Sequence, residues 1–332
     1  MKRKKRLTIE EYKSGVLSGD RVALSRAITL VESTLDEDNE MAAHLIDELY
    51  QYTGNSFRVG ITGVPGVGKS TFIESFGSHI LEEGKKLAVL TIDPSSQKTG
   101  GSILGDKTRM EKLSQSKNAF IRPSPSGDAL GGVAQKTRES MLLCEAAGFE
   151  VIFVETVGVG QSETAVKNMV DFFLLLMLAG AGDELQGIKK GIMEMADTIA
   201  INKADGNNIE AAKRAKKEYQ NALHLFPANE NGWIPEVKIC SALEDNGLSD
   251  IWDLLKEFKS QQKKNGYFDQ NRKEQSVHWM HQTIHHFLKR NFYKSPEVKA
   301  NLLKFEEAVR VGQKHSVQAA RNLLENYFKK LS

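Results

Sequence analysis

One short run of residues constrains the fold of this chain more than any other feature. Residues 63–70 read Gly-Val-Pro-Gly-Val-Gly-Lys-Ser and match the pattern G-x-x-x-x-G-K-[ST] without a departure. An apolar run at 57–62 precedes them and a helical pattern at 70–83 follows, which is the context of a phosphate-binding loop between a strand and a helix. Inward-turned backbone N–H groups and the N-terminus of the helix bind phosphate in such a loop. The sequence therefore predicts a P-loop nucleoside triphosphatase rather than a chance glycine-rich turn.

The residue types in this loop assign roles to individual side chains. We expect Lys69 to reach the β- and γ-phosphates of the nucleotide and the Ser70 hydroxyl to ligate Mg²⁺. The predicted nucleotide contacts of the loop are Gly63, Val64, Pro65, Gly66, Val67, Gly68, Lys69, Ser70 and Thr71. The motif thus predicts an enzyme that depends on magnesium.

A carboxylate near the metal is expected where the apolar run 151–155 ends. Glu155 stands there and can bind a metal-bound water, and the N–H of Gly158, three residues on, can sense the γ-phosphate. A glutamate at this position, rather than an aspartate, separates the chain from Ras-like GTPases because the extra methylene changes its reach.

Two aspartates are further candidates for the metal site. Asp93 follows a predicted strand, at the edge where doubly wound sheets bind ligands, and Asp106 ends a glycine-rich loop at 100–106 that can move as a switch does. A helix cap or a turn is the alternative role for either residue. Gln161 is a candidate for orienting the attacking water, although it lies three residues past Gly158. The predicted catalytic residues are Lys69, Asp93, Asp106, Glu155 and Gln161, and the predicted metal ligands are Ser70, Asp93, Asp106 and Glu155.

A second motif selects the base of the nucleotide. The apolar run 198–201 ends in Asn202-Lys203-Ala204-Asp205, an N-K-x-D motif. The Asp205 carboxylate can accept both N1–H and the 2-amino group of guanine, whereas adenine would face it with a lone pair, at a cost of ~1–3 kcal/mol or more. The motif therefore predicts GTP and GDP as substrate and product. The predicted base-site residues are Asn202, Lys203 and Asp205, with Ser241, Ala242 and Leu243 in a second loop that meets guanine O6.

Strand and helix patterns alternate through the middle of the chain. Seven apolar runs read as strands, at 57–62, 87–92, 119–122, 151–155, 172–177, 198–202 and 237–240. Most are continuously apolar and have helical segments between them, so we predict an α/β fold, a doubly wound, mostly parallel sheet. Residues 1–55 and 261–332 read as helical, which predicts three segments: an N-terminal helical extension (1–55), a P-loop GTPase domain (56–260) and a C-terminal helical arm (261–332).

Composition narrows the partners and the compartment. The 332 residues include 45 Lys+Arg and 43 Asp+Glu, a balance that gives no electrostatic reason to expect nucleic acid. The basic run at 2–6 fits a solvated, frayed terminus. No run approaches the ~20 apolar residues of a membrane span. Cys144 and Cys240 stand in apolar contexts, and a buried, reduced pair fits the cytoplasm.

Four segments together resemble the MeaB/ArgK family, namely 60–71, 99–110, 155–163 and 180–191. The resemblance runs from about residue 20 to 260 and is weak over the last 70 residues. It implies a GTPase chaperone of adenosylcobalamin-dependent methylmalonyl-CoA mutase, and a homodimer that pairs through the C-terminal arm. It also implies that Asp93 and Asp106 are switch I acids, and that 183–190 relays the nucleotide state to the mutase.

Two other functions are compatible with a P-loop of this class. One is a metal-delivery GTPase, for which the support is His278, His281, His285 and His286 on a predicted helix, although solvated surface histidines explain the same pattern. The other is a kinase acting on a transport protein, against which the N-K-x-D motif argues because a kinase would ordinarily be built for ATP.

Overall fold

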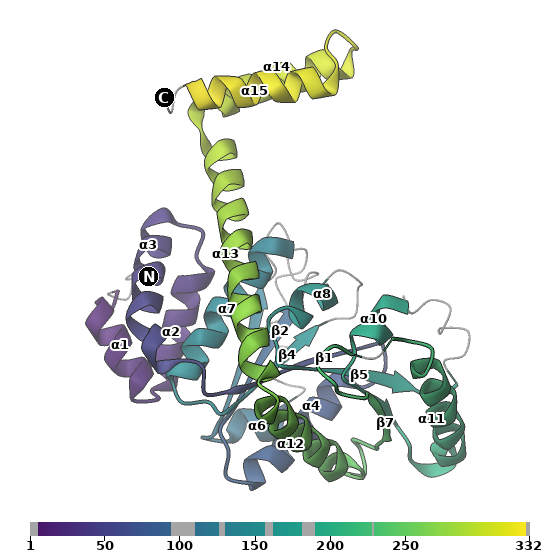
Figure 1. The fold of residues 1–332 in the computed structure, drawn as a ribbon. Helices are drawn as coiled ribbons and strands as arrows, with labels where there is room; N and C mark the ends of the chain where they lie inside the picture. The colour runs from purple at the N-terminus through teal and green to yellow at the C-terminus, as the bar shows by residue number, and fades with distance from the viewer. Residues whose placement is uncertain are drawn as a thin grey trace. The chain divides into compact units, whose positions relative to one another are not determined.

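The fold is described from a computed structural model that covers residues 6–93, 110–125, 130–156, 162–180, 190–227 and 229–329 (Figure 1). The chain divides into two compact units, Met1–Gln275 and Ser276–Ser332. The three segments expected from the sequence (1–55, 56–260 and 261–332) do not coincide with these two units, and they remain a prediction.

A seven-stranded sheet forms the centre of the first unit, in the order β3-β2-β4-β1-β5-β6-β7. Every pairing between neighbouring strands is parallel, so the predicted doubly wound α/β fold is confirmed. The strands are β1 (Phe57–Gly63), β2 (Leu87–Asp93), β3 (Ala119–Pro125), β4 (Val151–Thr156), β5 (Phe172–Leu178), β6 (Thr198–Asn202) and β7 (Glu236–Ile239).

Helices cover both faces of this sheet. Leu174 and Leu176 of β5 belong to a core shared with α4, α6 and α12, whereas Leu175 and Met177 pack with α10 and α11 on the other face. A strand covered on both sides has no polar face, which explains its continuously apolar sequence. These helices are α4 (Lys69–Glu82), α6 (Glu111–Gln115), α7 (Leu130–Ala146), α8 (Ser162–Lys167), α10 (Lys190–Met195), α11 (Ile209–Leu223) and α12 (Leu248–Lys264), with a 3-10 turn η2 (Gly206–Asn208) before α11.

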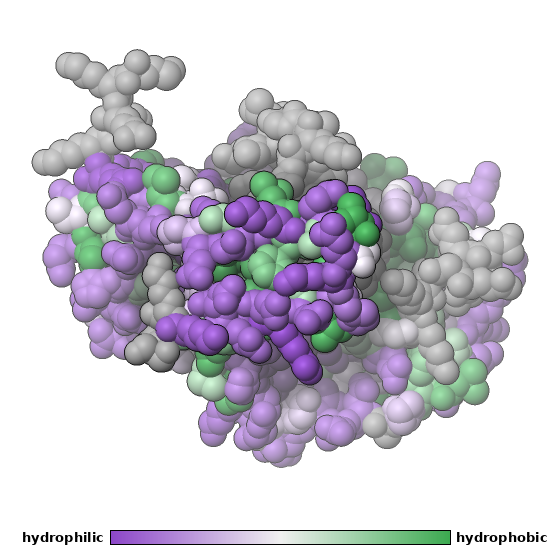
Figure 2. Space-filling view, turned by 90° about the horizontal axis from the view of Figure 1, so that it is seen from above, coloured by the Kyte–Doolittle hydropathy of each residue, from purple (hydrophilic) through white to green (hydrophobic). Residues whose placement is uncertain are grey.

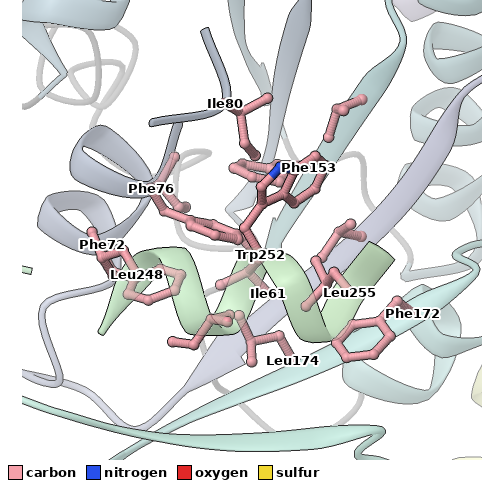
Figure 3. Close-up of a cluster of buried hydrophobic side chains, with 14 of the residues drawn as sticks. Ile61, Phe72, Phe76, Ile80, Phe153, Phe172, Leu174, Leu248, Trp252 and Leu255 are labelled. Carbon is pink, nitrogen blue, oxygen red and sulfur yellow. The ribbon is translucent and has the colours of Figure 1, made fainter. Parts of the chain in front are cut away.

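Aromatic side chains join α4 and α12 to the sheet (Figure 3). The Phe76 ring stacks on Phe153 of β4, with 5.5 Å between centroids, and meets the edge of Trp252 at 6.2 Å. Phe258 contacts Phe172 of β5 at 4.9 Å. Burying each of these side chains stabilises the fold by about 2–3 kcal/mol. These contacts hold α4, the helix that follows the phosphate loop, against the sheet.

Strands β1, β2, β4 and β5 each end one residue later than the sequence predicts, and β3 and β7 differ in other ways. The strand expected at 119–122 continues through Pro123 to Pro125, because β3 lies at the sheet edge, where a residue without an N–H is tolerated. The last strand begins at Glu236 and ends at Ile239, one residue before the predicted bounds.

Three helices precede the sheet. A capping box starts the first of them, since Thr8 and Glu11 exchange backbone–side-chain hydrogen bonds. The chain then turns at Gly19 (φ +74°), and Asp20 caps the next helix by accepting from Val22 N. The helices are α1 (Ile9–Leu17), α2 (Arg21–Glu32) and α3 (Asp36–Leu49), followed by η1 (Tyr50–Tyr52).

A buried ion pair joins the start of β1 to α7. The Arg58 guanidinium donates twice to Glu145, over 2.8 and 3.0 Å, and the same carboxylate accepts from Ser56 and from Gly54 N. Burial alone would raise the pKa of Glu145, but the Arg58 charge and these hydrogen bonds lower it. The pair therefore stabilises the fold above the ordinary carboxyl pKa of about 4.3, and this contribution is lost as the pH falls through the lowered value.

Replacing Arg58 with methionine is expected to lower the free energy of unfolding at pH 7 by about 3–5 kcal/mol, because Glu145 would stay buried without its counter-charge. Urea denaturation followed by circular dichroism measures the loss. The double variant Arg58→Met/Glu145→Gln is the control and should recover part of the loss. A single variant as stable as the wild type would contradict the assignment.

The long helix α13 (Tyr267–Lys294) begins in the first unit and continues into the second. Arg272 fixes its first turns, because the guanidinium donates to both Asp171 oxygens, over 2.8 and 2.7 Å, and to the carbonyls of Gly54 and Ser56. Asp171 lies just before β5 and also accepts from Arg58 N over 2.8 Å. The start of α13 is thus joined to the beginnings of β1 and β5.

The second unit contains the rest of α13 with α14 (Pro296–Arg310) and α15 (Ser316–Lys329). Phe292 and Tyr327 make an edge-to-face contact at 5.3 Å between α13 and α15. Large apolar side chains such as Leu303 and Phe328 are nevertheless exposed on this unit. The face of the molecule drawn in Figure 2 carries mainly hydrophilic side chains, with hydrophobic ones scattered among them. Within the described ranges, no helix has the length and apolar character that crossing a membrane requires.

Candidate nucleotide-binding site

The predicted phosphate loop connects β1 to α4, as its motif requires. Gly63 ends β1 so close to β5 that a Cβ atom on it would lie 2.6 Å from Leu176 O, and only glycine fits there. Gly66 and Gly68 have φ angles of +79° and +87°, which glycine adopts without strain. The glycines therefore allow the loop to turn back sharply before α4 begins at Lys69.

The Lys69 side chain folds back over its own loop. Its Nζ donates to Gly63 O over 2.8 Å and to Val64 O over 3.4 Å. Burial lowers the pKa of Lys69, and the nearby charges of Glu155 and Glu163 oppose this shift. A cation with its ammonium over the mouth of the loop is suited to neutralise a phosphate group.

Glu155 lies near the end of β4, with its Cα in register with Ile61 of β1 and Thr91 of β2. The side chain is only 8% exposed. The next residue, Thr156, donates its hydroxyl to the Thr62 hydroxyl over 2.7 Å and joins β4 to β1 beside the loop. Glu155 is thus held at the strand edge from which the phosphate loop emerges.

The structure describes some of the predicted site residues only in part, and others not at all. Asp93 is the last residue of β2, at the same sheet edge as Glu155, and only its backbone is described. Asp106, Gly158 and Gln161 lie outside the described residues, as does 183–189 of the predicted relay segment.

Glu163 is an acid that the sequence analysis did not select as a site residue. It lies in the first turn of α8 and is 1% exposed, and its charge acts on Lys69. In the sequence, Glu163 is marked only by its position at the end of the stretch 155–163, which carries the family resemblance. No spacing rule connects that position with the P-loop lysine, so only the fold shows that the two charges interact.

The predicted base loop is joined to the phosphate loop by Asn202, the last residue of β6. Its Nδ2 donates to Val67 O over 2.9 Å, and its Oδ1 accepts from Ala242 N over 3.1 Å. A Cβ atom on Gly68 would lie 3.7 Å from Lys203 Cε, so the Lys203 stem passes close to the phosphate loop. Lys203 has φ +60°, an uncommon backbone conformation for a residue other than glycine.

Asp205 and Ser241 come together although they are far apart in sequence. Ser241 Oγ donates to Asp205 Oδ2 over 2.6 Å and accepts from Glu244 N over 3.1 Å. The Ser75 hydroxyl of α4 donates to Ala242 O over 2.7 Å. Leu243, the third residue predicted in this loop, is 81% exposed. The phosphate loop, which carries Lys69, and the base loop, which carries Asp205, are thus held next to each other.

Among the residues that the structure describes, the fold brings no further metal ligands to the histidines of α13. His281 and His285 are both exposed. Across the part of the chain that the structure describes, no three His, Cys, Asp or Glu side chains are placed to hold a metal ion together. The free cysteines are buried, and burial raises the pKa of the Cys240 thiol to about 12.

A glycine-rich loop between β1 and α4, with an N-K-x-D loop at the end of β6, two strands away in the sheet, defines a P-loop GTPase. Residues 24–297 match the model of the family described as methylmalonyl Co-A mutase-associated GTPase MeaB. The chain belongs to this family.

Relatives along nearly the whole chain agree with this class. A probable GTPase of Mycobacterium tuberculosis is 49% identical over 318 residues, which cover 96% of this chain and 95% of the relative. The methylmalonic aciduria type A homolog, mitochondrial, of Mus musculus is 43% identical over 329 residues, covering 96% of this chain and 79% of that protein. A crystal structure of a LAO/AO transport system kinase has a TM-score of 0.75 at 38% identity, covering 98% of this chain and 99% of that one. The predicted activity, GTP hydrolysis, is confirmed at the level of the family.

Proposed function

We propose that this GTPase acts as a chaperone of an adenosylcobalamin-dependent methylmalonyl-CoA mutase, assisting the loading and protection of its cofactor. The observation that carries the proposal is the match of residues 24–297 to a family described as associated with that mutase. The name of the mouse relative, which refers to methylmalonic aciduria, supports the same pathway.

The described residues suit the chemistry that the proposal needs. Ser70 and Glu155 would supply a hydroxyl and a carboxylate to Mg²⁺, which prefers oxygen ligands, and neither side chain is exposed. The metal would neutralise charge on the β- and γ-phosphates when bound. Lys69 would add a positive charge from the side of the loop, and Glu155 would hold a water of the metal shell. Asp205 would read guanine.

The proposed assembly and compartment follow from the same relationship. We infer a homodimer, supported by the apolar side chains such as Leu303 and Phe328 that the second unit exposes. We infer the cytoplasm, supported by two buried free cysteines, which suit a reducing compartment.

The experiment is to measure GTP turnover with and without an adenosylcobalamin-dependent mutase from the same source. We expect slow turnover alone and faster turnover in the complex, since a client that prefers one nucleotide state must shift that state. In Lys189→Ala the stimulated rate should fall more than the basal rate. An equal loss in both rates would assign Lys189 to the chemistry itself, and no stimulation of the wild type by any such mutase would refute the chaperone role.

Two further measurements separate the alternatives. A kinase, the description carried by the structural relative, would transfer the γ-phosphate to a protein and prefer ATP. A metal-delivery GTPase would bind a transition metal in fixed stoichiometry through residues such as His281 and His285. Nucleotide preference tests the first alternative and metal content after purification tests the second.

A further inference from the structure

A pocket of about 400 Å³ lies at the end of the sheet opposite the phosphate loop. Its apolar wall consists of the methylene stems of the lining lysines above Phe57, the first residue of β1, and Trp252 of α12, which are 2% and 3% exposed. Since β1 runs six residue steps from Phe57 to Gly63, the pocket is about 20 Å from the phosphate loop. Its volume falls in the range of small-molecule sites, and its position excludes direct overlap with a nucleotide bound at the loop.

Four lysines line this pocket, and two of them are neutralised. Lys85 pairs with Glu150 over 3.2 Å. Lys256 pairs with Glu83 over 3.1 Å and with Asp253 over 2.8 Å. These two lysines therefore have their counter-charges within the protein.

The other two lysines, Lys259 and Lys263, have no carboxylate partner among the residues with described positions. Their ammonium groups lie over aromatic rings, Lys259 5.2 Å from the centroid of Phe57 and Lys263 5.5 Å from that of Phe268. Burial lowers the pKa of Lys259, and the Lys263 charge lowers it further against a weaker opposing effect of Asp171. Two neighbouring cations thus share the site without a carboxylate of their own, since the Glu150 carboxylate that lines the same pocket pairs with Lys85.

We propose that this lysine pocket binds a small organic phosphate, with the phosphate group between Lys259 and Lys263 and the apolar part of the ligand against the lysine stems that cover Phe57 and Trp252. A phosphate dianion matches two lysine ammonium groups in charge and accepts hydrogen bonds from both. The apolar stems of the lysines favour a ligand with a ring or an apolar chain over a bare anion. The site is separate from the nucleotide site and does not depend on the proposed mutase partner.

Calorimetric titration of phenyl phosphate into protein saturated with GDP and Mg²⁺ tests the proposal, because GDP occupies the phosphate loop. We expect saturable binding of one molecule per chain. The variant Lys259→Met/Lys263→Met should bind at least ~10-fold more weakly, since methionine keeps an apolar stem and removes the charge. Its melting temperature should not fall, because the substitution relieves repulsion between like charges.

The matched control is Lys264→Met, an exposed lysine of the same helix that does not line the pocket, and its affinity should equal that of the wild type. Phenol should not bind, and inorganic phosphate should bind more weakly than phenyl phosphate. No saturable binding to the wild type, or equal affinity in the double variant, would overturn the proposal. Equal affinity for inorganic phosphate would overturn the assignment of the apolar wall.

Discussion

Replacing Lys69 with alanine is expected to reduce single-turnover GTP hydrolysis by about 100- to 1,000-fold. The loss of one preorganised charge or donor at a developing negative charge has an effect of this size. Lys69 already points over the phosphate loop, with its ammonium held by Gly63 O and Val64 O. When nucleotide binds, these two carbonyls would be exchanged for phosphate oxygens, and alanine offers nothing in their place.

Two comparisons make the Lys69 result specific. Lys86→Ala, an exposed lysine at the opposite end of the sheet, should keep wild-type turnover. Glu155→Ala should lower turnover with less effect on GDP affinity, because this carboxylate acts through the metal and the attacking water rather than on the β-phosphate. Wild-type turnover in Lys69→Ala would show that the phosphate loop does not take part in hydrolysis. Wild-type turnover in Glu155→Ala would show the same for that carboxylate.

Asp205→Asn is expected to weaken GTP binding by about 10- to 100-fold and to strengthen binding of xanthosine triphosphate. The hydrogen bond from Ser241 Oγ to Asp205 Oδ2 explains why. An asparagine would accept this bond with its side-chain oxygen, which leaves its NH₂ group facing the base. An amide donor complements the C2 carbonyl of xanthine and meets the 2-amino group of guanine with a donor, a mismatch of ~1–3 kcal/mol.

Equilibrium titration with both nucleotides measures this exchange of preference. Asp250→Asn makes the same chemical change at an exposed position on α12 and should leave both affinities as in the wild type. Unchanged GTP affinity in Asp205→Asn would refute the assignment of guanine recognition to this loop.

Local patterns predicted most of the fold because local physics decides most of it. The Thr8 capping box needs only a four-residue spacing, and continuously apolar strands need only a sheet covered on both faces. The predicted strand ended at Arg122, just before Pro123, and a proline is normally excluded from the middle of a sheet. The strand continues because it lies at the sheet edge, a position that its own residues do not specify.

The site was predictable as a set of strand ends and much less so as a set of contacts. Motif order placed Lys69, Glu155 and Asp205 at one edge of the sheet. The bond between Ser241 and Asp205, and the effect of Glu163 on Lys69, join residues whose separation in sequence follows no rule. For the same reason, the sequence could not predict that Lys259 and Lys263 lack a carboxylate partner among the described residues. Which acids lie near a lysine depends on the fold.

The single amide of Asn202 holds both the carbonyl of Val67 and the N–H of Ala242. The loop predicted to hold the phosphates and the loop predicted to read the base therefore share one anchor. For evolution, this arrangement separates two kinds of change. A substitution at Asp205 can alter the choice of base while the phosphate loop keeps its support, so a lineage can exchange nucleotides in one step. A substitution at Asn202 removes the shared support of both loops at once.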